Sequence, residues 1–495
     1  MTAKAGNDKI TAKAVMVLGT TSGAGKSWLT TALCRYYARL GLKVAPFKAQ
    51  NMSNNARVVD GGEIGSAQYF QSLAANAVPE VRMNPLLLKP ERDTHSQVIL
   101  LGQVNDELTH APWRDRSERV WPTIQKALNE LMAENDVVVI EGAGSPAEIN
   151  LKANDIVNMR VAVAAHAACL LVTDIDRGGA FAHLYGTFAL LPPEEQALIK
   201  GFVLNKFRGD PSLLTPGPEM LQDMTGVPVV ATLPMWWQHG LPEEDGVFDD
   251  RSVASGAVKT TIAVIAYPRI SNLDEFQALK NVPGVRLKWA RSPSEILDAD
   301  WVILPGSKHT SGDLAWLRSQ GLDAAIAAHA AQGKAVLGIC GGLQMLGEAL
   351  IDMHDIDVKF GNNAPGLGLL PLVTNFEIAK TVQHRQTQFS KLTGVWSKLS
   401  DVTVAGYEIH HGQTAQHPAM AKAGDVAVAV LPDALGWQNP AGNVLGLYLH
   451  GMFEDPAVLH ALFGATTPTL DSVFDGLADY ISQHFEKNFL NSLIA

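Results

Sequence analysis

The feature that most constrains how this chain folds is the run GTTSGAGKS at residues 19–27. It follows an apolar run at residues 14–18 and leads into residues 26–40, which we predict to be helical. A strand, a glycine-rich loop and a helix in this order are typical of a phosphate-binding loop. The sequence therefore predicts a nucleotide-binding α/β domain with a doubly wound parallel sheet, in which active-site loops follow buried strands.

The residue types in this loop suit ATP. Glycines let backbone N–H groups converge on phosphate oxygens, and the start of the helix adds partial positive charge. Lys26 supplies a charge for the outer phosphates, and the Ser27 hydroxyl is a ligand for Mg²⁺. The first glycine stands one residue before the standard position, which is Thr20 here, and a plain glycine-rich turn would not explain the Lys-Ser pair. The predicted ATP-binding residues are Thr20, Gly23, Ala24, Gly25, Lys26 and Ser27.

The rest of the chain repeats the alternation of apolar runs and helical stretches. At roughly 150 residues per domain, 495 residues should form more than one domain. Further strands are predicted at residues 43–46, 136–140, 169–173, 201–204, 261–266, 301–304, 335–339 and 444–449, and a last helix at 470–485. Residues 236–257 contain Pro, Gly and an acidic cluster and read as a linker. We therefore expect two α/β domains, at residues 1–250 and 258–495.

Bulk composition excludes several classes of protein. A net charge of −11 opposes non-specific nucleic-acid binding, although a pocket can still be locally basic. The longest apolar run, residues 161–172, contains His166 and is shorter than the roughly 20 residues that span a membrane. The cysteines Cys34, Cys169 and Cys340 are far apart, which suits a reducing compartment. We expect a cytoplasmic protein that acts on small molecules, without nucleic-acid or membrane partners.

Polar residues at the ends of predicted strands are candidates for the transfer chemistry. Glu141 follows an apolar strand and is predicted to face the phosphates and bind Mg²⁺, with a solvated strand-end glutamate as the alternative. Asp174 and Asp176 end another strand beside Arg177, and a structural turn is an equally good explanation for one of the two. Asn205 stands where many such ATPases and GTPases recognise the base.

A second constellation centres on Cys340, in the run VLGICGGLQM at residues 336–345. An apolar strand turns abruptly into a helix at this cysteine, which is the pattern of a nucleophile elbow. The turn exposes the thiol at a helix N-terminus, which favours the thiolate, and the N–H of Gly341 can face a developing oxyanion. A buried structural cysteine is the alternative, but the flanking glycines favour a nucleophile.

A thiol nucleophile needs a base, and His450 at the end of the last predicted strand is the best candidate. The turn after residues 301–304 offers a second oxyanion donor near Gly306. The polar segment 406–412 is expected to be a tightly turned loop. It contains His410 and His411, which either line the glutamine site or anchor a hairpin.

These residues resemble the triad, or class I, family of glutamine amidotransferases, in which the cysteine forms a glutamyl thioester and releases ammonia. The second domain is therefore expected to have that fold. That family has a carboxylate two residues after the histidine, where this chain has Met452, and Glu454 comes two residues late. The third member of the triad is thus open, and weak or conditional glutaminase activity is expected.

The whole chain resembles the cobyric acid synthase family of corrinoid amidases, whose first half is similar to dethiobiotin synthetase. The resemblance is carried by residues 46–54, 62–65, 83–90, 96–99, 141–150 and 174–179. It implies ATP- and glutamine-dependent amidation of the b, d, e and g carboxylates of adenosylcobyrinic acid a,c-diamide in cobalamin biosynthesis, through acyl phosphates and with Mg²⁺. It also implies that Lys48, Gln50, Asn51, Asp174 and Asp176 contact the corrinoid or the transferred phosphate.

Three other functions compete with this one. The nearest is the related synthase that makes the a,c-diamide, although segments 48–54 and 83–90 favour the enzyme acting on the diamide. The second is an amidotransferase for a cell-wall precursor. The third is a regulatory ATPase with an inactive glutaminase domain, and Thr21 speaks against it because that class has an extra lysine early in its loop.

Overall fold

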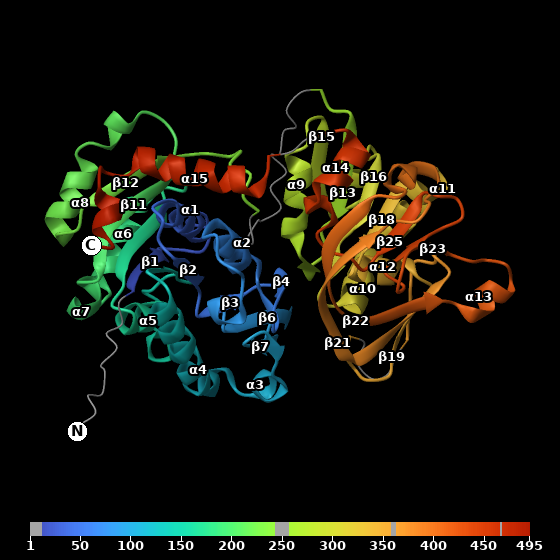
Figure 1. Cartoon of the computed structure of the whole chain (residues 1–495), viewed down its shortest axis with the longest axis horizontal. Coiled ribbons are helices and arrows are strands. Elements are labelled where there is room, and N and C mark those ends of the chain that lie inside the picture. The colour runs from blue at the N-terminus through green and yellow to red at the C-terminus, as the bar shows by residue number, and fades with distance from the viewer. Residues whose placement is uncertain (1–11, 243–256, 358–362, 466–467) are drawn as a thin grey trace, which may run out of the picture.

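The computed structural model describes residues 12–242, 257–357, 363–465 and 468–495. Two α/β domains lie side by side, the first blue to green and the second yellow to orange (Figure 1). Within the described ranges, no helix is both long enough and apolar enough to cross a bilayer. Most of the predicted linker, residues 243–256, lies outside the described part of the chain.

The first domain is built on a six-stranded sheet in the order β12-β11-β10-β1-β9-β2, and all its neighbouring strands are parallel. Its strands are β1 (Lys13–Gly19), β2 (Val44–Phe47), β9 (Val137–Glu141), β10 (Ala168–Asp174), β11 (Ile199–Phe207) and β12 (Val229–Pro234). Because β1 lies between β9 and β10, the loops after these three strands meet at one edge, where open α/β sheets bind ligands.

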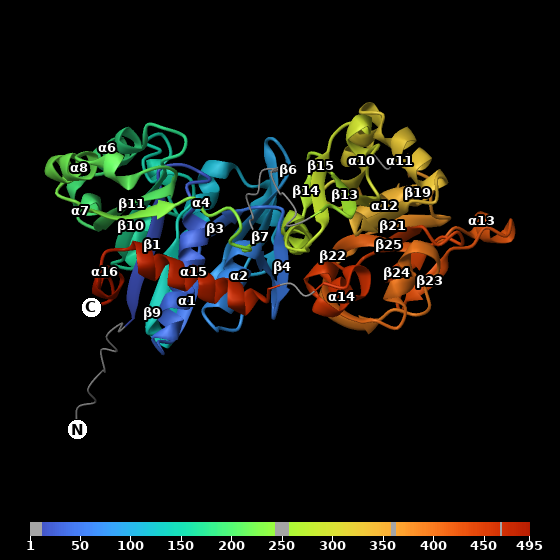
Figure 2. The ribbon, with the colours of Figure 1, turned by 90° about the horizontal axis from the view of Figure 1, so that it is seen from above.

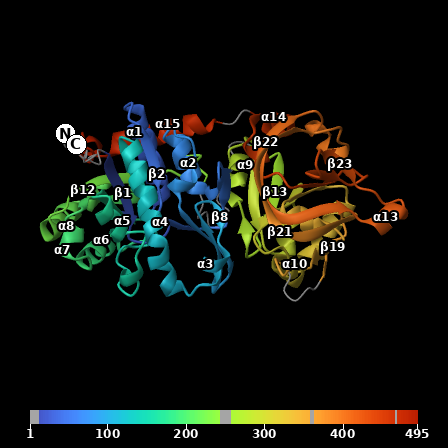
Figure 3. The same cartoon turned by 60° about the horizontal axis from the view of Figure 1, so that its bottom comes forward.

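Side chains alternate between two apolar cores on the two faces of this sheet. Met16 and Leu18 of β1 belong to one cluster, and Val15 and Val17 to the other. The helices of this domain are α1 (Lys26–Arg39), α2 (Ser66–Ala74), α3 (Asp106–His110), α4 (Trp113–Glu134), α5 (Met159–Ala164), α6 (Ala180–Ala189), α7 (Pro193–Gln196) and α8 (Gly217–Thr225). Figure 3 brings α4 and α5 forward, on the face opposite α1.

An insertion between β2 and β9 forms the side of the first domain that faces the second. It contains a four-stranded sheet and a hairpin, made of β3 (Gln50–Met52), β6 (Leu86–Arg92), β7 (His95–Leu100) and β8 (Gln103–Val104), and of β4 (Ala56–Val59) and β5 (Gly62–Gly65). Both β4 and β5 contact the long strand β21 (Leu372–Gln388) of the second domain. The insertion therefore supplies first-domain side chains to the interface (Figure 1).

The second domain has a seven-stranded sheet in the order β15-β13-β16-β18-β25-β24-β23, parallel from β15 to β25. Its strands are β13 (Thr260–Ile265), β15 (Val285–Ala290), β16 (Trp301–Leu304), β18 (Ala335–Ile339), β23 (Val428–Leu431), β24 (Gly436–Gln438) and β25 (Val444–Leu447). Its helices are α9 (Gln277–Lys280), α10 (Thr310–Ser319), α11 (Leu322–Ala331), α12 (Gly341–Leu346), α13 (Pro418–Lys422) and α14 (Pro456–Phe463). The predicted α/β class is confirmed for both domains.

A second sheet and a short ladder complete this domain. Their strands are β19 (Ala349–Asp352), β20 (Ala364–Pro365), β21 and β22 (Thr403–Gln416), with β14 (Ile270–Ser271) pairing β17 (Gly306–Ser307). Segment 406–412, expected to be a tight turn, lies inside β22, where it pairs with β21. The prediction was wrong because Glu408 and His410 are buried and bonded to each other within this ladder, so the polar residues do not mark a loop.

The end of the chain returns to the first domain. Helix α15 (Leu470–His484) lies along α1, and α16 (Phe489–Ser492) follows it (Figure 2). Phe474, Leu477 and Ile481 belong to the apolar cluster of α1, and Arg39 pairs with Asp479 at 2.7 Å. Helix α15, which the expected second domain at 258–495 includes, therefore buries its apolar face against the first domain, and the domain bounds stay a prediction.

Candidate active sites

The phosphate loop lies between β1 and α1. Gly23 and Gly25 have φ angles of 71° and 102°, in the left-handed region that glycine tolerates best. The Asn205 amide donates a 2.9 Å hydrogen bond to the carbonyl of Ala24. A Cβ on Gly25 would lie 2.1 Å from the Asn205 nitrogen, so the loop has room only for glycine here. Asn205 thus anchors the loop, and its contact with a base stays a prediction.

A buried carboxylate faces this loop. Glu141 Oε1 accepts hydrogen bonds of 2.8 Å from Ser27 Oγ and from Lys48 Nζ, and Gln71 donates to the other oxygen. Burial alone would raise the pKa of Glu141, but the Lys48 charge and these hydrogen bonds lower it below the usual value. The carboxylate therefore stays ionised at the start of α1, where Ser27 follows the lysine of the loop.

Ser27 and Glu141 have the chemistry of a magnesium site. Their two oxygens lie 2.8 Å apart at the start of α1. Mg²⁺ in phosphate-binding sites takes one or two protein oxygens and completes its shell with phosphates and water. These residues fit that donor set, and when Mg²⁺ is bound it would neutralise charge on the transferred phosphate.

The two aspartates predicted to bind substrate, Asp174 and Asp176, lie in different surroundings. Asp174 lies at the mouth of the loop, 3.2 Å from Lys206 Nζ, and Lys206 also donates to the carbonyl of Gly23 at 2.8 Å. Asp176 pairs instead with Arg208 on the surface. Thr20 donates to Thr173 at 3.0 Å. Substrate contact by either aspartate stays a prediction.

The residues expected to contact the acceptor lie beside Glu141. Lys48 pairs with it directly, and Asn51 is joined to it through Gln68 and Gln71. Asn51, Gln68 and Gln71 are at most 4% exposed. Gln50 is half-buried at the start of β3. The structure thus gathers Lys48 and Asn51 at the phosphate site, where an anionic carboxylate would be bound.

Cys340 occupies a strained turn between β18 and α12. Its φ and ψ are 51° and −105°, a backbone conformation that non-glycine residues seldom adopt. A Cβ on Gly342 would lie 1.9 Å from the carbonyl oxygen of Leu304, so the elbow closes only because that position lacks a side chain. Strain of this kind gathers at functional sites. The geometry is that of a nucleophile elbow.

His450 lies beside the thiol and is oriented by Glu275. Its ring interacts with the Cys340 side chain, and its Nδ1 lies 3.1 Å from Glu275 Oε1. The backbone N–H of Gly451 donates to the other Glu275 oxygen at 2.9 Å. Burial lowers the pKa of His450, but the charges of Glu275 and Cys340 outweigh it and raise that pKa to about 10. His450 can therefore hold the proton of the thiol.

Glu275 is the site residue that the sequence did not reveal. It lies 175 positions before His450, in a 3-10 turn at Leu273–Phe276, and no spacing rule connects the two. Glu454, the nearer candidate, pairs with Arg57 at 2.6 Å. The expectation of weak glutaminase activity rested on the lack of a carboxylate at Met452, and Glu275 removes that reason.

The two expected oxyanion glycines lie next to this triad. A Cβ on Gly306 would be 2.8 Å from His450 Cε1, and a Cβ on Gly341 would be 2.8 Å from the backbone nitrogen of Ser307. Backbone N–H groups near Cys340 thus come from both β17 and α12. That they bind an oxyanion stays a prediction.

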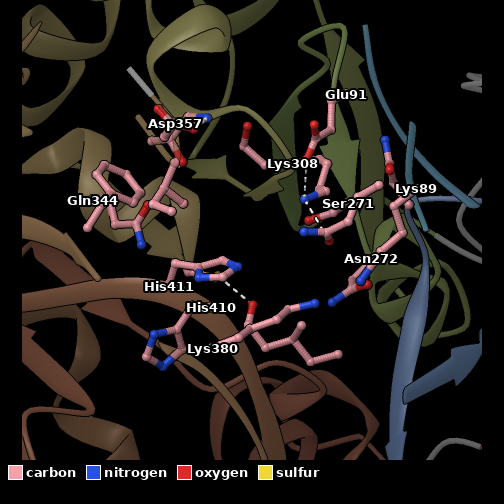
Figure 4. Close-up of a pocket in the computed structure, with 18 of the residues that line it drawn as sticks. Lys89, Glu91, Ser271, Asn272, Lys308, Gln344, Asp357, Lys380, His410 and His411 are labelled. Atoms are coloured by element: carbon pink, nitrogen blue, oxygen red, sulfur yellow. Dashed lines mark hydrogen bonds and ion pairs between the residues drawn. The ribbon is translucent and has the colours of Figure 1, made fainter. Parts of the chain in front are cut away.

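A pocket opens in front of Cys340 and is lined by both domains (Figure 4). Second-domain residues on it include Gln344, Asp357, His410 and His411, so the histidines of β22 face the pocket. The first domain contributes Asn54, Lys89, Glu91 and Gln97. The glutaminase pocket is therefore completed by the neighbouring domain.

Charged side chains cross the interface around this pocket. Lys308 pairs with Glu91 at 2.9 Å, as Figure 4 shows, and Lys89 pairs with the buried Glu63 at 2.5 Å. Lys380 of β21 also contacts Glu63. Burial would raise the pKa of Glu63, but the charges of the two lysines lower it to about 2. Burial and the nearby charges of Lys89 and Lys308 lower the pKa of Lys380 to about 7, although the Glu63 carboxylate opposes them.

A phosphate loop beside a buried carboxylate, together with a Cys–His–Glu triad in a second domain, defines an ATP-dependent ligase that takes ammonia from glutamine. Residues 15–242 match the CobQ/CobB/MinD/ParA nucleotide binding domain, and residues 261–458 match the CobB/CobQ-like glutamine amidotransferase domain. The chain belongs to the cobyric acid synthase family.

Two relatives carry that assignment over the full length. The cobyric acid synthase of Polaromonas naphthalenivorans is 78% identical over 98% of this chain and 100% of its own length. That of Variovorax paradoxus is 75% identical, with the same coverage of both chains.

Proposed function

We propose that this protein amidates the b, d, e and g carboxylates of adenosylcobyrinic acid a,c-diamide, with glutamine as the ammonia donor. The main support for this proposal is the pocket at Cys340, because its walls come from both the glutaminase and the domain that holds the phosphate loop. Membership of the cobyric acid synthase family supports the choice of corrinoid. An enzyme that acts on small molecules and depends on ATP and Mg²⁺ fits a cytoplasmic location.

Glutamine is cleaved at the triad. With the thiol proton already held by His450, the Cys340 thiolate attacks the γ-carboxamide carbon of glutamine, and backbone N–H groups at Gly306 and Gly341 stabilise the oxyanion. The C–N bond breaks, the departing amine takes the proton from His450, and a glutamyl thioester remains. Water then attacks the thioester carbon while His450 removes a proton from it, the C–S bond breaks, and glutamate leaves. The Cys340 thiolate and protonated His450 are thereby restored.

The acceptor carboxylate is activated at the phosphate loop. One carboxylate oxygen attacks the γ-phosphorus of ATP, the bond to ADP breaks, and an acyl phosphate forms. Lys26 and Lys48 offset the developing charge, and Ser27 and Glu141 would hold Mg²⁺. Ammonia attacks the acyl carbon, inorganic phosphate leaves, and the amide carries the nitrogen. Four such cycles consume four molecules each of ATP and glutamine.

The decisive experiment compares substrates and nitrogen donors on the purified protein. We expect ATP-dependent amidation of the a,c-diamide with either glutamine or ammonia. Turnover only of the non-amidated corrinoid would identify the enzyme that makes the diamide and refute the proposal.

A Cys340→Ala variant separates the two half-reactions. We expect it to lose glutamine-dependent amidation and to keep ammonia-dependent amidation. Loss of both, or of neither, would contradict the division of the chain into an ammonia-producing and an amide-forming site.

A further inference from the structure

A short strand of the first domain is bonded to the segment that carries Glu275. The N–H of Leu273 donates to Asn55 Oδ1 at 3.0 Å, and the N–H of Ala56 donates to Asn272 Oδ1 at 3.0 Å. Asn55 and Asn272 are each 3% exposed. The first domain thus holds Asn272 and Leu273, which lie shortly before Glu275, through two hydrogen bonds between a side chain and the backbone.

Arg57, which follows Ala56 in the same strand, contacts one residue near Glu275 and one residue near His450. Its guanidinium donates to Asp274, the neighbour of Glu275, and makes two bonds of 2.6 and 2.8 Å to Glu454, which follows His450 in the chain. Arg57 is 2% exposed, and its charge is set between two carboxylates of the other domain. A planar guanidinium that bonds two carboxylates fixes their relative positions as well as their charge.

Tyr407 provides a second connection from Arg57 to the imidazole. The guanidinium carbon of Arg57 lies 5.1 Å from the centre of the Tyr407 ring. That ring stacks on His450, with the ring centres 5.4 Å apart and the planes 20° from parallel. The backbones of Tyr407 and His450 also exchange hydrogen bonds of 3.2 and 2.9 Å. Arg57 therefore reaches both Glu275 and His450 through one intervening residue each.

We propose that Arg57 is a positioning residue of the glutaminase, supplied by the ATP-binding domain. It holds Asp274 and Tyr407 in place and so fixes Glu275 against His450, which makes efficient glutamine cleavage depend on contact between the domains. The inference rests on the proposed glutaminase function of Cys340. Arg57 is not among the residues that line the Cys340 pocket, so it acts on the triad and not on glutamine itself.

Two substitutions test this arrangement. Arg57→Met removes the guanidinium, and Asp274→Asn keeps the side-chain volume while it removes the charge next to Glu275. We expect each to lower the kcat of glutamine-dependent amidation at least tenfold, with the KM for glutamine within twofold. The kcat of ammonia-dependent amidation should stay within twofold, because the phosphate site is untouched. Arg57→Lys keeps the charge but not the planar guanidinium that bonds two carboxylates. Its glutamine-dependent kcat should lie between those of Arg57→Met and the unsubstituted chain.

Arg269→Met is the matched control. Arg269 pairs with Asp93 across the same domain interface at 2.6 Å, and neither residue lines the pocket at Cys340. We expect it to leave both kcat values within twofold. The proposal is overturned if Asp274→Asn keeps full glutamine-dependent kcat, or if it loses the ammonia-dependent reaction to the same extent. An unsubstituted chain that cannot use glutamine would instead refute the proposed function.

Discussion

Glu275 Oε1 lies 3.1 Å from His450 Nδ1, and both side chains are buried in the second domain. The carboxylate arrives from a turn after the first strand of the domain, and the histidine from the end of β25. A residue that holds a catalytic histidine in one orientation and tautomer contributes strongly to the rate, although it does not touch the substrate.

Replacing Glu275 should therefore impair the glutaminase alone. Glu275→Gln keeps the shape but removes the negative charge, so the pKa of His450 should fall from about 10 toward its ordinary value. We expect glutamine-dependent turnover to fall by roughly 10²-fold at pH 7.5, with ammonia-dependent turnover unchanged. A pH profile of both reactions measures this. Glu454→Gln, at the position nearer to His450 in the chain, should have the smaller effect, and the reverse order would show that Glu454 orients the histidine.

The raised pKa of His450 also makes a prediction about stability. A histidine whose pKa is higher in the folded than in the unfolded chain contributes stability that is complete below pH 6.5 and is lost as pH rises through about 10. The contribution should be on the order of a few kcal/mol. Urea unfolding of the unsubstituted chain and of His450→Gln at several pH values would measure it. Their difference should shrink between pH 7 and 10, and a constant difference would contradict the charge assignment.

Gly25 should be irreplaceable for a steric reason. A methyl group there would overlap the Asn205 amide that anchors the phosphate loop. We expect Gly25→Ala to weaken ATP binding at least tenfold by calorimetry and to abolish both amidation reactions. Gly226→Ala is the matched control, since Gly226 has a φ of 73° but open space around it. It should cost about 1–2 kcal/mol of stability and leave ATP binding intact, so equal effects would refute the steric argument.

The last helix should stabilise the first domain. Leu477 is fully buried in the cluster that α15 forms with α1. Leu477→Ala should cost about 2–5 kcal/mol of unfolding free energy. We expect the loss in the thermal transition that ATP shifts upward, with the glutaminase transition unmoved. A lower melting temperature of the glutaminase, with the first domain unchanged, would contradict this assignment of α15.

Contiguous motifs were predictable because their geometry is local. The phosphate loop, the Cys340 elbow and the strand end at Glu141 each depend on a few successive residues, and glycine, lysine and serine at fixed spacing imply a backbone shape. Strand positions followed from apolar runs of the right length. His410 and His411 were harder, because a strand with polar residues and a polar turn have similar composition, and only the β21–β22 pairing distinguishes them.

Reading the residues alone was enough to predict two α/β domains, the phosphate loop, the elbow at Cys340 and His450 as its candidate base. Only the tertiary structure decided that Glu275 completes the triad, that Arg57 reaches it from the other domain, and that α15 returns to α1. The physical reason is the same in each case. A buried charge requires an opposite charge, and an apolar helix face requires an apolar surface to pack against. Neither requirement says where in the sequence the matching residues lie.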